Sequence, residues 1–336
     1  MVDPTTRRYL EKAVELYGLR EYAFEEVPGH EGGRNRIFIG RSEGKPDRVL
    51  RLSPLGDRKK DDYLAELEFV RYLAQNGAPV ADVIPSGSGN LVESFVMDEK
   101  TLFVTLFAYA EGILISDNGY RYREGAPLEE YFHETGRVLG ILHRLAKGYV
   151  PAHRRASYFE KYNAGYLDVL IPDDYAELKA AIFRRLDAFH ALATDRECFG
   201  LVHFDFSDGN YHINYDTGAI TVFDFDNCMD CWYMFDLANL WIHGIGWYRS
   251  EKDAEKRMAS MTRYFETILE GYRSETVISD EQLKQLPLFI DMVLIENIVD
   301  EFECCAREGE ALDYEDIEDA AGCLIESIPY AGYGRD

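Results

Sequence analysis

The sequence predicts an α+β fold with two lobes: a small lobe built on an antiparallel sheet over residues 1–109, and a larger, mainly helical lobe over residues 110–336. Most segments typical of strands, bounded by glycine and other turn residues, lie in the first 107 residues. Amphipathic helical patterns dominate after residue 112. The chain of 336 residues exceeds the usual size of one domain, and its 46% of hydrophobic residues can fill two cores.

The predicted N-terminal lobe begins with a short helix over Tyr9–Tyr17 and continues as strands whose connections carry glycine. Apolar residues at helical spacing, such as Leu64, Leu67 and Val70, predict a longer helix after the third strand. The expected elements are, in order, strands at 24–27, 36–40 and 48–52, a helix at 59–75, and strands at 90–95 and 101–107. These five strands are expected to form one antiparallel sheet.

The predicted C-terminal lobe consists of amphipathic helices. The first carries Leu128, Phe132, Leu139 and Leu142 at helical spacing. The expected helices lie at 127–147, 175–192, 232–247, 254–272, 281–307 and 312–328. Met, Tyr and Trp side chains along them are interpreted as core residues rather than as cofactor contacts.

One segment of the C-terminal lobe carries the chemistry. Residues His203 to Asn210 match the pattern HxDxxxxN, and Asp224 follows Asp205 by nineteen residues. Phosphoryl transfer needs a carboxylate to accept the proton of the attacking hydroxyl, and oxygen ligands that hold Mg²⁺ against the nucleotide phosphates. We therefore assign Asp205 as the catalytic base, with His203 beside it, and Asn210 and Asp224 as metal ligands.

The residues that follow predict a β-hairpin that supports this assignment. Two apolar or alternating runs, Tyr211–Tyr215 and Ala219–Asp224, flank the turn-like Asp216-Thr-Gly218. Such a hairpin places Asn210 and Asp224 at the same end of a rigid ribbon. The alternative is that His, Asp and Asn here serve ordinary turn chemistry.

A glycine-rich loop between the first two predicted strands is a candidate phosphate site. The loop runs Gly29-His-Glu-Gly32-Gly33-Arg34-Asn35, and its backbone amides are suited to cover nucleotide phosphates. Gly32, Gly33 and Asn35 are therefore expected nucleotide contacts. The alternative is an ordinary tight turn.

The third predicted strand offers Arg51 as a cation for the nucleotide phosphates. Glu66 and Glu68 on the next helix are its candidate partners. Glu66 is preferred because its position about one turn into the helix resembles the glutamate placement in kinase-like folds, whereas Glu68 is expected to face solvent. Arginine in place of lysine departs from the protein-kinase pattern, although a guanidinium keeps the charge and can grip phosphate with two hydrogen bonds. Phe107, where the chain leaves the sheet, is the expected apolar wall for adenine.

The formal charge of −25 argues against a nucleic-acid partner, because phosphate backbones are bound by surplus Lys and Arg. It favours a cationic small molecule. Residues 271–336 hold 17 acids against 4 bases, and some of these carboxylates are candidates to attract an amine-bearing substrate. The alternative is that they form solvated helix faces.

No stretch reads as a signal peptide or as a membrane span, so a cytoplasmic protein without a membrane partner is expected. The six cysteines do not form the dense framework of a small secreted domain and are expected to be reduced. Cys228-Met-Asp-Cys231 is a CxxC pair without a second ligand pair at zinc-site spacing. The oligomeric state cannot be derived from the sequence.

Six short segments of the sequence, in their order, resemble the aminoglycoside phosphotransferase and choline kinase superfamily, and the resemblance extends over nearly the whole chain. The matching segments are 49–53, 66–73, 140–143, the HxDxxxxN box, 221–226 and 235–238. The resemblance implies a bilobal, protein-kinase-like fold and transfer of the γ-phosphate of ATP, or GTP, to a hydroxyl of a small molecule with Mg²⁺. The expected acceptor is an aminoglycoside, an amino alcohol, a sugar or an amino acid.

The sequence departs from related patterns at three points. Phe204 stands where many relatives have glycine, Asp226 replaces the glycine of D-F-G, and no A-P-E element follows. The last absence argues against an ordinary protein kinase. Asp226 is assigned as a further metal ligand or substrate contact, with a loop hydrogen-bonding role as the alternative, while Asp236 is expected to stabilise the catalytic loop.

Two other functions stay open on these residues. A stress-response type Ser/Thr protein kinase shares the same catalytic box and would need an open acceptor groove. A catalytically inactive nucleotide-binding scaffold is disfavoured because Asp205, Asn210 and Asp224 occur together.

Overall fold

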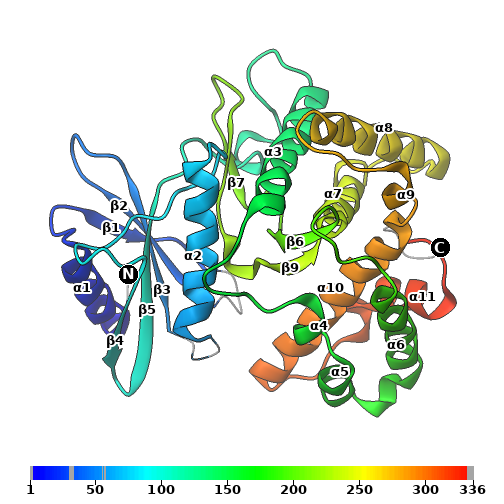
Figure 1. Ribbon diagram of the computed structural model, residues 1–336, viewed down its shortest axis with the longest axis horizontal. Helices are drawn as coiled ribbons and strands as arrows, with labels where there is room; N and C mark the ends of the chain where they lie inside the picture. Colours follow the sequence, from blue (N-terminus) through cyan, green and yellow to red (C-terminus); the bar gives the residue numbers. More distant parts are fainter. Residues whose placement is uncertain (1–2, 30–33, 55, 57, 331–336) are drawn as a thin grey trace. The chain divides into compact units, whose positions relative to one another are not determined.

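The computed structural model describes residues 3–29, 34–54, 56 and 58–330, which divide into two compact units (Figure 1). The first unit contains the described residues of 1–124 together with 149–155 and 209–226. The second contains 125–148, 156–208 and the described residues of 227–336. The first unit therefore includes two segments that come from the C-terminal part of the sequence.

Within the described residues of the first unit, five strands form the antiparallel sheet that the sequence predicted, and their order is β1-β2-β3-β5-β4. The elements are α1 (Pro4–Tyr17), β1 (Ala23–Glu26), β2 (Arg36–Arg41), β3 (Arg48–Ser53), α2 (Lys60–Gln75), β4 (Val92–Met97), β5 (Lys100–Ala108) and a 3₁₀ turn at Ser116–Asn118. Helix α1 begins at Pro4 rather than Tyr9, because the Asp3 carboxylate accepts hydrogen bonds from the backbone N–H groups of Thr5 and Thr6.

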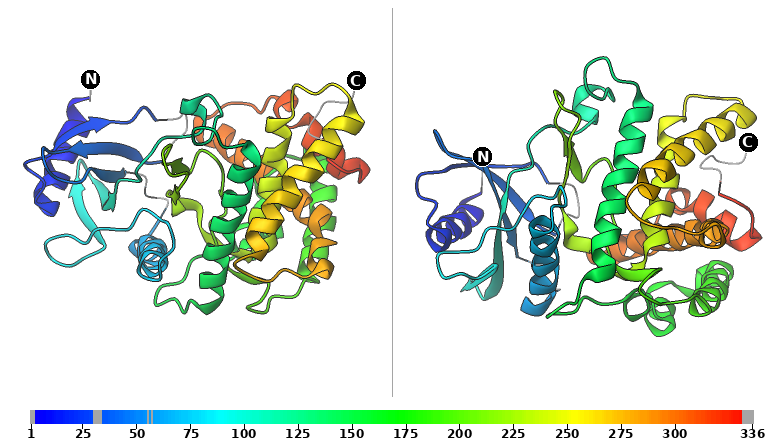
Figure 2. Two further views of the ribbon diagram at one scale, coloured as in Figure 1. Left: turned by 90° about the horizontal axis from the view of Figure 1, so that it is seen from above. Right: turned by 45° about the horizontal axis from the view of Figure 1, so that its top comes forward.

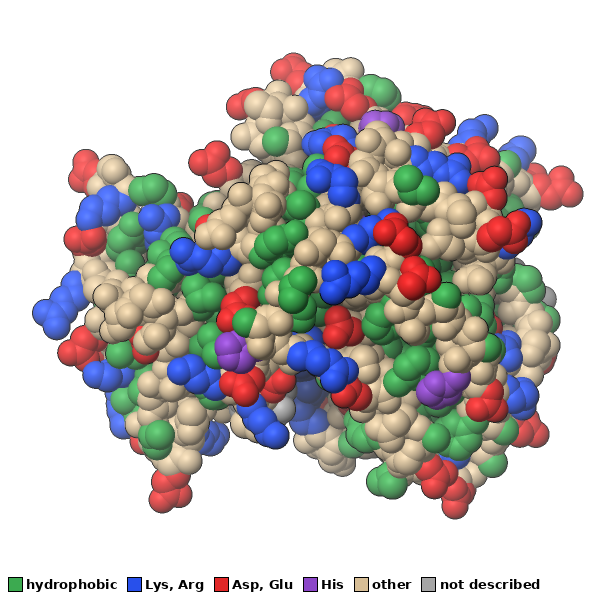
Figure 3. Space-filling view, viewed as in Figure 1, with side chains coloured by type: hydrophobic (Ala, Val, Ile, Leu, Met, Phe, Trp, Pro, Cys, Tyr) green, Lys and Arg blue, Asp and Glu red, His purple; other side chains and the backbone are tan. Residues whose placement is uncertain are grey.

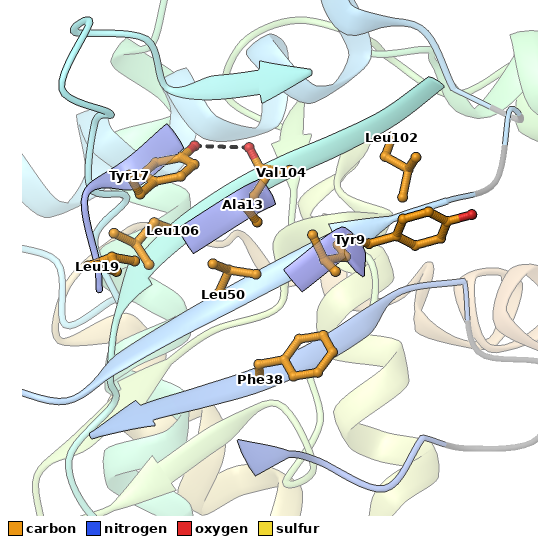
Figure 4. Close-up of a cluster of buried hydrophobic side chains, with 10 residues drawn as sticks. Tyr9, Ala13, Tyr17, Leu19, Phe38, Leu50, Leu102, Val104 and Leu106 are labelled. Carbon is orange, nitrogen blue, oxygen red and sulfur yellow. Dashed lines mark hydrogen bonds between the residues drawn. The ribbon is translucent and has the colours of Figure 1, made fainter. Parts of the chain in front are cut away.

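Alternation along the strands sends side chains to two different cores. Leu102, Val104 and Leu106 of β5 are buried with residues of α1, and the Tyr17 hydroxyl donates to the Val104 carbonyl at 2.9 Å (Figure 4). Phe103 belongs to a separate cluster with residues of α2. Since successive strand residues point to opposite faces, α1 and α2 cover opposite faces of the sheet.

The same alternation fixes the direction of Arg51. Its neighbours Leu50 and Leu52 are buried in the α1 cluster. Arg51 therefore points to the other face of β3, where α2 packs. The strand pattern alone thus brings a charged side chain against the helix that carries the candidate glutamates.

The predicted hairpin is present as β7 (Tyr211–Ile213) and β8 (Ile220–Val222), shorter than the sequence pattern suggested. Its turn is held by the Asn214 side chain, which accepts hydrogen bonds from the N–H groups of Asp216 and Thr217 at 3.1 and 3.0 Å. Gly218 has φ of 80°, a conformation that favours glycine. The hairpin therefore has a fixed turn, and its two open-end neighbours, Asn210 and Phe223, are joined by a backbone hydrogen bond of 2.9 Å.

The second unit is mainly helical in its described residues, with one short pair of antiparallel strands, β6 and β9. Its elements are α3 (Leu128–Gly148), α4 (Tyr158–Lys161), α5 (Ala164–Leu170), α6 (Ala176–His190), β6 (Phe199–Val202), β9 (Met229–Trp232), α7 (Tyr233–Trp247), α8 (Ala254–Arg273), α9 (Asp280–Leu283), α10 (Leu286–Glu308) and α11 (Glu318–Glu326), with 3₁₀ turns at Asp173–Tyr175, Phe225–Asn227 and Tyr314–Asp316.

Two sequence predictions for this unit differ from the structure, and one pair of strands was missed. The single helix expected at 281–307 is two helices, and Pro287 lies in the first turn of α10, where its missing N–H is tolerated. The helix expected at 312–328 is a 3₁₀ turn followed by α11. The pair β6 and β9 was not predicted, because strands of four residues are too short to show a period.

Helices α3 and α8 cross at very close range and lie side by side in both views of Figure 2. A Cβ atom on Gly136 would overlap the carbonyl oxygen of Ile268, and one on Gly271 would overlap that of His133. The glycines therefore permit backbone contact between the two helices. Helix α3, which also carries His143, is therefore packed directly against the backbone of α8.

No described helix is long and apolar enough to cross a membrane. On the face drawn in Figure 3, acidic and basic side chains are interspersed. Many charged side chains form ion pairs with near neighbours on the surface. In the first unit, for example, the exposed Arg41 pairs with Glu25.

Candidate active site

Arg51 and Glu66 form a buried ion pair in the first unit. The two terminal nitrogens of Arg51 donate to the two Glu66 carboxylate oxygens at 2.8 and 2.9 Å, and Arg51 Nε donates to Thr105 at 3.2 Å. Burial opposes the charge on both groups, but their mutual attraction outweighs it, lowering the pKa of Glu66 and raising that of Arg51. The predicted pairing is confirmed, and its role toward nucleotide stays a prediction.

Glu68, the other candidate partner, has a different contact. Its carboxylate accepts hydrogen bonds from the backbone N–H of His153 at 3.2 Å and from His153 Nδ1 at 2.8 Å. The expectation that Glu68 simply faces solvent was wrong. It ties α2 to the segment 149–155 within the first unit.

Asp226 lies among cationic and amide donors of the first unit. Its Oδ1 accepts from Arg58, its Oδ2 accepts from Asn35 Nδ2 at 3.0 Å, and Arg51 NH1 lies 3.9 Å from Oδ1. The backbone carbonyl of Asp226 accepts from Arg155 at 2.7 Å. These contacts match the alternative that the sequence left open, in which Asp226 is a hydrogen-bonding residue of its loop.

Asn35 connects the end of the glycine-rich loop to this carboxylate. Its side-chain oxygen accepts from the Ser53 hydroxyl at 2.6 Å, while its amide nitrogen donates to Asp226. Gly32 and Gly33, the other expected loop contacts, lie outside the described residues. Of the three expected loop contacts, the structure describes Asn35, which lies beside β3.

Arg58 and Arg155 were not identified from the sequence. Burial, and the nearby charges of Arg155 and Arg34, lower the pKa of Arg58 to about 10. With Arg51, four guanidinium groups therefore gather near Asp226. In the sequence, Arg58 begins the basic run Arg58-Lys-Lys60, which could have indicated an anion-binding residue, whereas no comparable feature distinguishes Arg155.

Asn210 and Asp224 flank the two strands of the hairpin. Asp224 is exposed, has φ of 60°, and its charge contributes to the raised pKa of Arg51. A non-glycine residue with positive φ is uncommon and often marks a functional position. In the described part of the chain, no three His, Cys, Asp or Glu side chains form a metal-binding group. The expected donors are instead two carboxylates and one amide, oxygen ligands of the kind that Mg²⁺ prefers.

The loop that follows β6 and begins at His203, called the catalytic loop below for its proposed role, is held by Asp236. The Asp236 carboxylate accepts hydrogen bonds from the backbone N–H of His203 at 3.1 Å and from that of Phe204 at 3.0 Å. Phe204, with φ of 71°, stacks on Phe235 with ring centroids 4.2 Å apart. The prediction that Asp236 stabilises this loop is confirmed.

The buried His203 also contacts Asp205, because its Nδ1 accepts a hydrogen bond from the Asp205 backbone N–H at 3.3 Å. This contact helps to shape the loop that presents the Asp205 side chain. The assignment of His203 and Asp205 as catalytic residues stays a prediction.

His143 continues the hydrogen-bond network behind the loop. Its Nδ1 lies 3.0 Å from the Tyr272 hydroxyl, and its Nε2 lies 3.2 Å from Asp236. Burial lowers the pKa of His143, so a neutral ring that donates from Nε2 to Asp236 and accepts from Tyr272 fits both contacts. In the sequence, His143 lies in segment 140–143, which resembles the kinase superfamily, but no role was predicted for it.

Carboxylates of α10 lie within electrostatic range of Asp205 in the second unit. Burial raises the pKa of Glu296 to about 8; Lys161 opposes this rise, and Asp300, Asp205 and Glu303 add to it. This group contains part of the acidic surplus seen in the sequence. A cation bound there would relieve repulsion among the carboxylates.

Phe107 is half-buried on β5. The Arg51 guanidinium lies 5.2 Å from the centroid of its ring, within the range of a cation–π contact. Phe107 also packs with the α2 cluster. Its role as a wall for adenine stays a prediction.

The five-stranded antiparallel sheet, the helical second unit and the HxDxxxxN loop define a kinase-type phosphotransferase. The chain belongs to the phosphotransferase enzyme family, whose model matches residues 25–275. Both the family and the fold predicted from the sequence are confirmed. Membership implies a nucleotide as the phosphate donor.

The chain is 27% identical to the amicoumacin kinase of Bacillus subtilis (strain 168) over 287 residues, covering 84% of this chain and 80% of that protein. Among solved structures, it resembles an amicoumacin kinase in complex with AMP-PNP, Ca²⁺ and Ami, with a TM-score of 0.79, 22% identity, and coverage of 98% and 95% of the two chains. It also resembles a microcompartment-associated aminopropanol kinase, with a TM-score of 0.67, 17% identity, and coverage of 96% and 95%. The two structural likenesses show the shared fold.

Proposed function

We propose that this protein transfers the γ-phosphate of ATP to a hydroxyl group of a small, amine-bearing molecule, with Mg²⁺ as the metal. The family membership supports phosphoryl transfer. The related amicoumacin kinase structure is a complex with AMP-PNP, an analogue of ATP, which supports ATP as the donor. Two relatives, an amicoumacin kinase and an aminopropanol kinase, supply the first acceptors to test.

The hydrogen bonds that hold the catalytic loop carry this proposal. Asp236 fixes the backbone of His203 and Phe204, the two residues before Asp205. A base acts best when the surrounding chain holds it in place before the substrate arrives. Asp205 would accept the proton of the acceptor hydroxyl as the phosphoryl group is transferred.

Asn210 and Asp224, with Asp226 as a further ligand, would hold Mg²⁺. The ion would neutralise charge on the nucleotide phosphates. Arg51, kept charged and oriented by Glu66, would contact these phosphates. Gly32, Gly33 and Asn35 are the proposed phosphate contacts of the loop, and Phe107 is the proposed adenine contact.

The acidic group of α10 supports an amine on the acceptor. Glu296 is a partly buried carboxyl whose pKa of about 8 reflects burial and the nearby charges of Asp300, Asp205 and Glu303. An ammonium group would stabilise the charged form of these carboxylates. The same charges would repel an anionic acceptor, which gives the site selectivity.

The test is Mg²⁺-dependent release of ADP from ATP, with GTP in parallel, across amicoumacin, aminopropanol, aminoglycosides, sugars and protein substrates. Acceptor-stimulated turnover that Asp205→Asn abolishes and Asp216→Asn leaves intact would support the proposal. Asp216, in the exposed hairpin turn, is the matched control for loss of one carboxylate. Turnover with protein acceptors alone would contradict the small-molecule assignment.

A further inference from the structure

The contacts of Asp226 conflict with its simple use as a metal ligand. One carboxylate oxygen accepts from Arg58 and the other from Asn35. The side chains of Arg58 and Asp226 are 12% and 11% exposed, so little water screens this pair. A cation at Asp226 would have to displace the positive charge of Arg58.

Arg51 is poorly placed to serve the phosphates by itself. All three of its guanidinium nitrogens already donate hydrogen bonds, two to Glu66 and one to Thr105. Its charge is also largely compensated by Glu66, and its side chain is 3% exposed. A triphosphate therefore calls for at least one further cation in this region.

Arg58 differs from its neighbour Arg155 in the kind of contact that it makes. Arg155 donates to two backbone carbonyls, those of Asp62 at 3.2 Å and Asp226 at 2.7 Å, and so ties the chain together. Arg58 instead donates to a side-chain carboxylate from the connection that precedes α2. Rotation of the Arg58 side chain would release it without breaking backbone contacts.

The local charge balance also indicates an anion site. The chain as a whole has 61 acids against 36 Lys and Arg residues, yet Arg34, Arg51, Arg58 and Arg155 gather beside Asp226. A concentration of arginine in an acidic protein attracts anions to that region. Guanidinium groups suit phosphate because they offer two parallel donors.

We propose that Arg58 binds the nucleotide phosphates and is held by Asp226 until the metal and nucleotide arrive. Asp226 would then hold the metal and release Arg58, whose guanidinium would turn to the phosphates. This inference rests on the proposed function, and it assigns Arg58 a role in nucleotide binding. It predicts that one substitution changes metal and nucleotide affinity in opposite directions.

The test compares the wild-type protein with Arg58→Gln in two binding experiments. ATP affinity is measured by calorimetry with saturating Mg²⁺ and no acceptor, and Mn²⁺ affinity without nucleotide by electron paramagnetic resonance. We expect Arg58→Gln to bind ATP about 10- to 100-fold more weakly, the range of a hydrogen bond to a charged group. We expect the same variant to bind Mn²⁺ more tightly, because Asp226 is released.

Arg41→Gln is the matched control, since it removes an exposed arginine of β2 that pairs with Glu25 and Asp47. It should change neither affinity. Adenosine affinity should also be the same in Arg58→Gln as in wild type, because adenosine has no phosphate. If Arg58→Gln weakens ATP and Mn²⁺ binding together, or leaves ATP binding unchanged, the proposal is overturned.

A mutant cycle with Asp226→Asn tests the release step itself. Asp226→Asn should tighten metal-free ATP binding because it frees Arg58, and this gain should disappear in the Arg58→Gln/Asp226→Asn double variant. An equal gain in both backgrounds would contradict a role for Arg58. Should Arg58→Gln fail to fold, Arg58→Lys provides the comparison and should still lose several-fold in ATP affinity, because it lacks the paired donors.

The two proposals fail in different ways. If wild type binds no ATP even with Mg²⁺, the proposed function fails, and the assignment of Arg58 fails with it. If wild type binds ATP and turns over an acceptor while Arg58→Gln matches it in both binding experiments, the assignment of Arg58 alone fails.

Discussion

Single polar residues determine the geometry of the catalytic loop. The carboxylate of Asp236 binds two consecutive backbone N–H groups, and His143 and Tyr272 extend the same network. A buried network of this kind specifies one conformation when each member has a partner. The loop therefore depends on residues far from it in the sequence.

Asp236→Asn should lower kcat and leave ATP affinity nearly unchanged. The amide keeps the shape of the carboxylate, but it has one acceptor oxygen for two backbone donors, so His203 or Phe204 loses a hydrogen bond. One unsatisfied buried N–H costs roughly 1–3 kcal/mol. Steady-state kinetics and urea unfolding measure the two effects, with the exposed Asp195→Asn as control. Unchanged kcat would show that the loop does not need this contact.

Glu296 should make binding of an amine acceptor depend on pH. Its pKa of about 8 means that the carboxyl gains charge as pH rises through that value. The KM of an amine acceptor should therefore fall between about pH 7 and pH 9, and this trend should disappear in Glu296→Gln. Glu308→Gln, on the same helix, is the control. A pH profile that Glu296→Gln shares with wild type would exclude this role.

The same pKa sets the direction of a stability effect. The folded pKa of about 8 lies above the ordinary value of 4.5, so the folded protein retains a proton that the unfolded chain releases. This contribution to stability is present below about pH 4.5 and is lost as pH rises toward 8. Glu296→Gln should consequently gain stability relative to wild type at pH 8.5 more than at pH 5.

From the sequence, contacts could be predicted only for residues that belong to a recognisable motif or to neighbouring secondary-structure elements. Arg51 and Glu66 could be paired because a strand is followed by a helix. The HxDxxxxN spacing gave Asp205 and Asn210 as the proposed base and metal ligand, and these roles stay predictions. Arg58, Arg155 and His143 make contacts that depend on how distant segments fold together. Such isolated polar residues leave no periodic signal in the sequence.

At the scale of elements, the packing of α3 against α8 depends on small residues. Gly136 and Gly271 allow backbone atoms of the two helices to touch. The sequence predicted both helices but gave no indication that they cross so closely. Likewise, the short pair β6 and β9 was missed, although it leads directly into the catalytic loop and α7.

Gly136→Ala should destabilise the protein by about 1–3 kcal/mol, the usual cost of an overpacked core. The added Cβ would overlap the backbone of Ile268, which cannot move aside as a flexible side chain can. Urea unfolding measures the effect. Gly246→Ala is the matched control, because a Cβ there meets open space on a helix and should be neutral or stabilising by about 0.5–1 kcal/mol. Equal stability of the two variants would contradict the close crossing.

At the scale of the whole molecule, the proposed catalytic residues are distributed over both compact units. Asp205 belongs to the second unit, while Asn210 and Asp224 belong to the first. The chain itself joins them through the four residues 206–209. The proposed roles therefore divide between the two units, with phosphate and metal contacts proposed for residues of the first unit and the base for a residue of the second.

The most direct test of the account is the activity of Asp205→Asn at saturating ATP, Mg²⁺ and an acceptor that wild type phosphorylates. The account predicts that kcat falls by about 10²- to 10⁴-fold, the usual contribution of a general base, while the Kd for ATP stays unchanged. Full activity in Asp205→Asn would contradict the assignment of Asp205 as the base and, with it, the central claim.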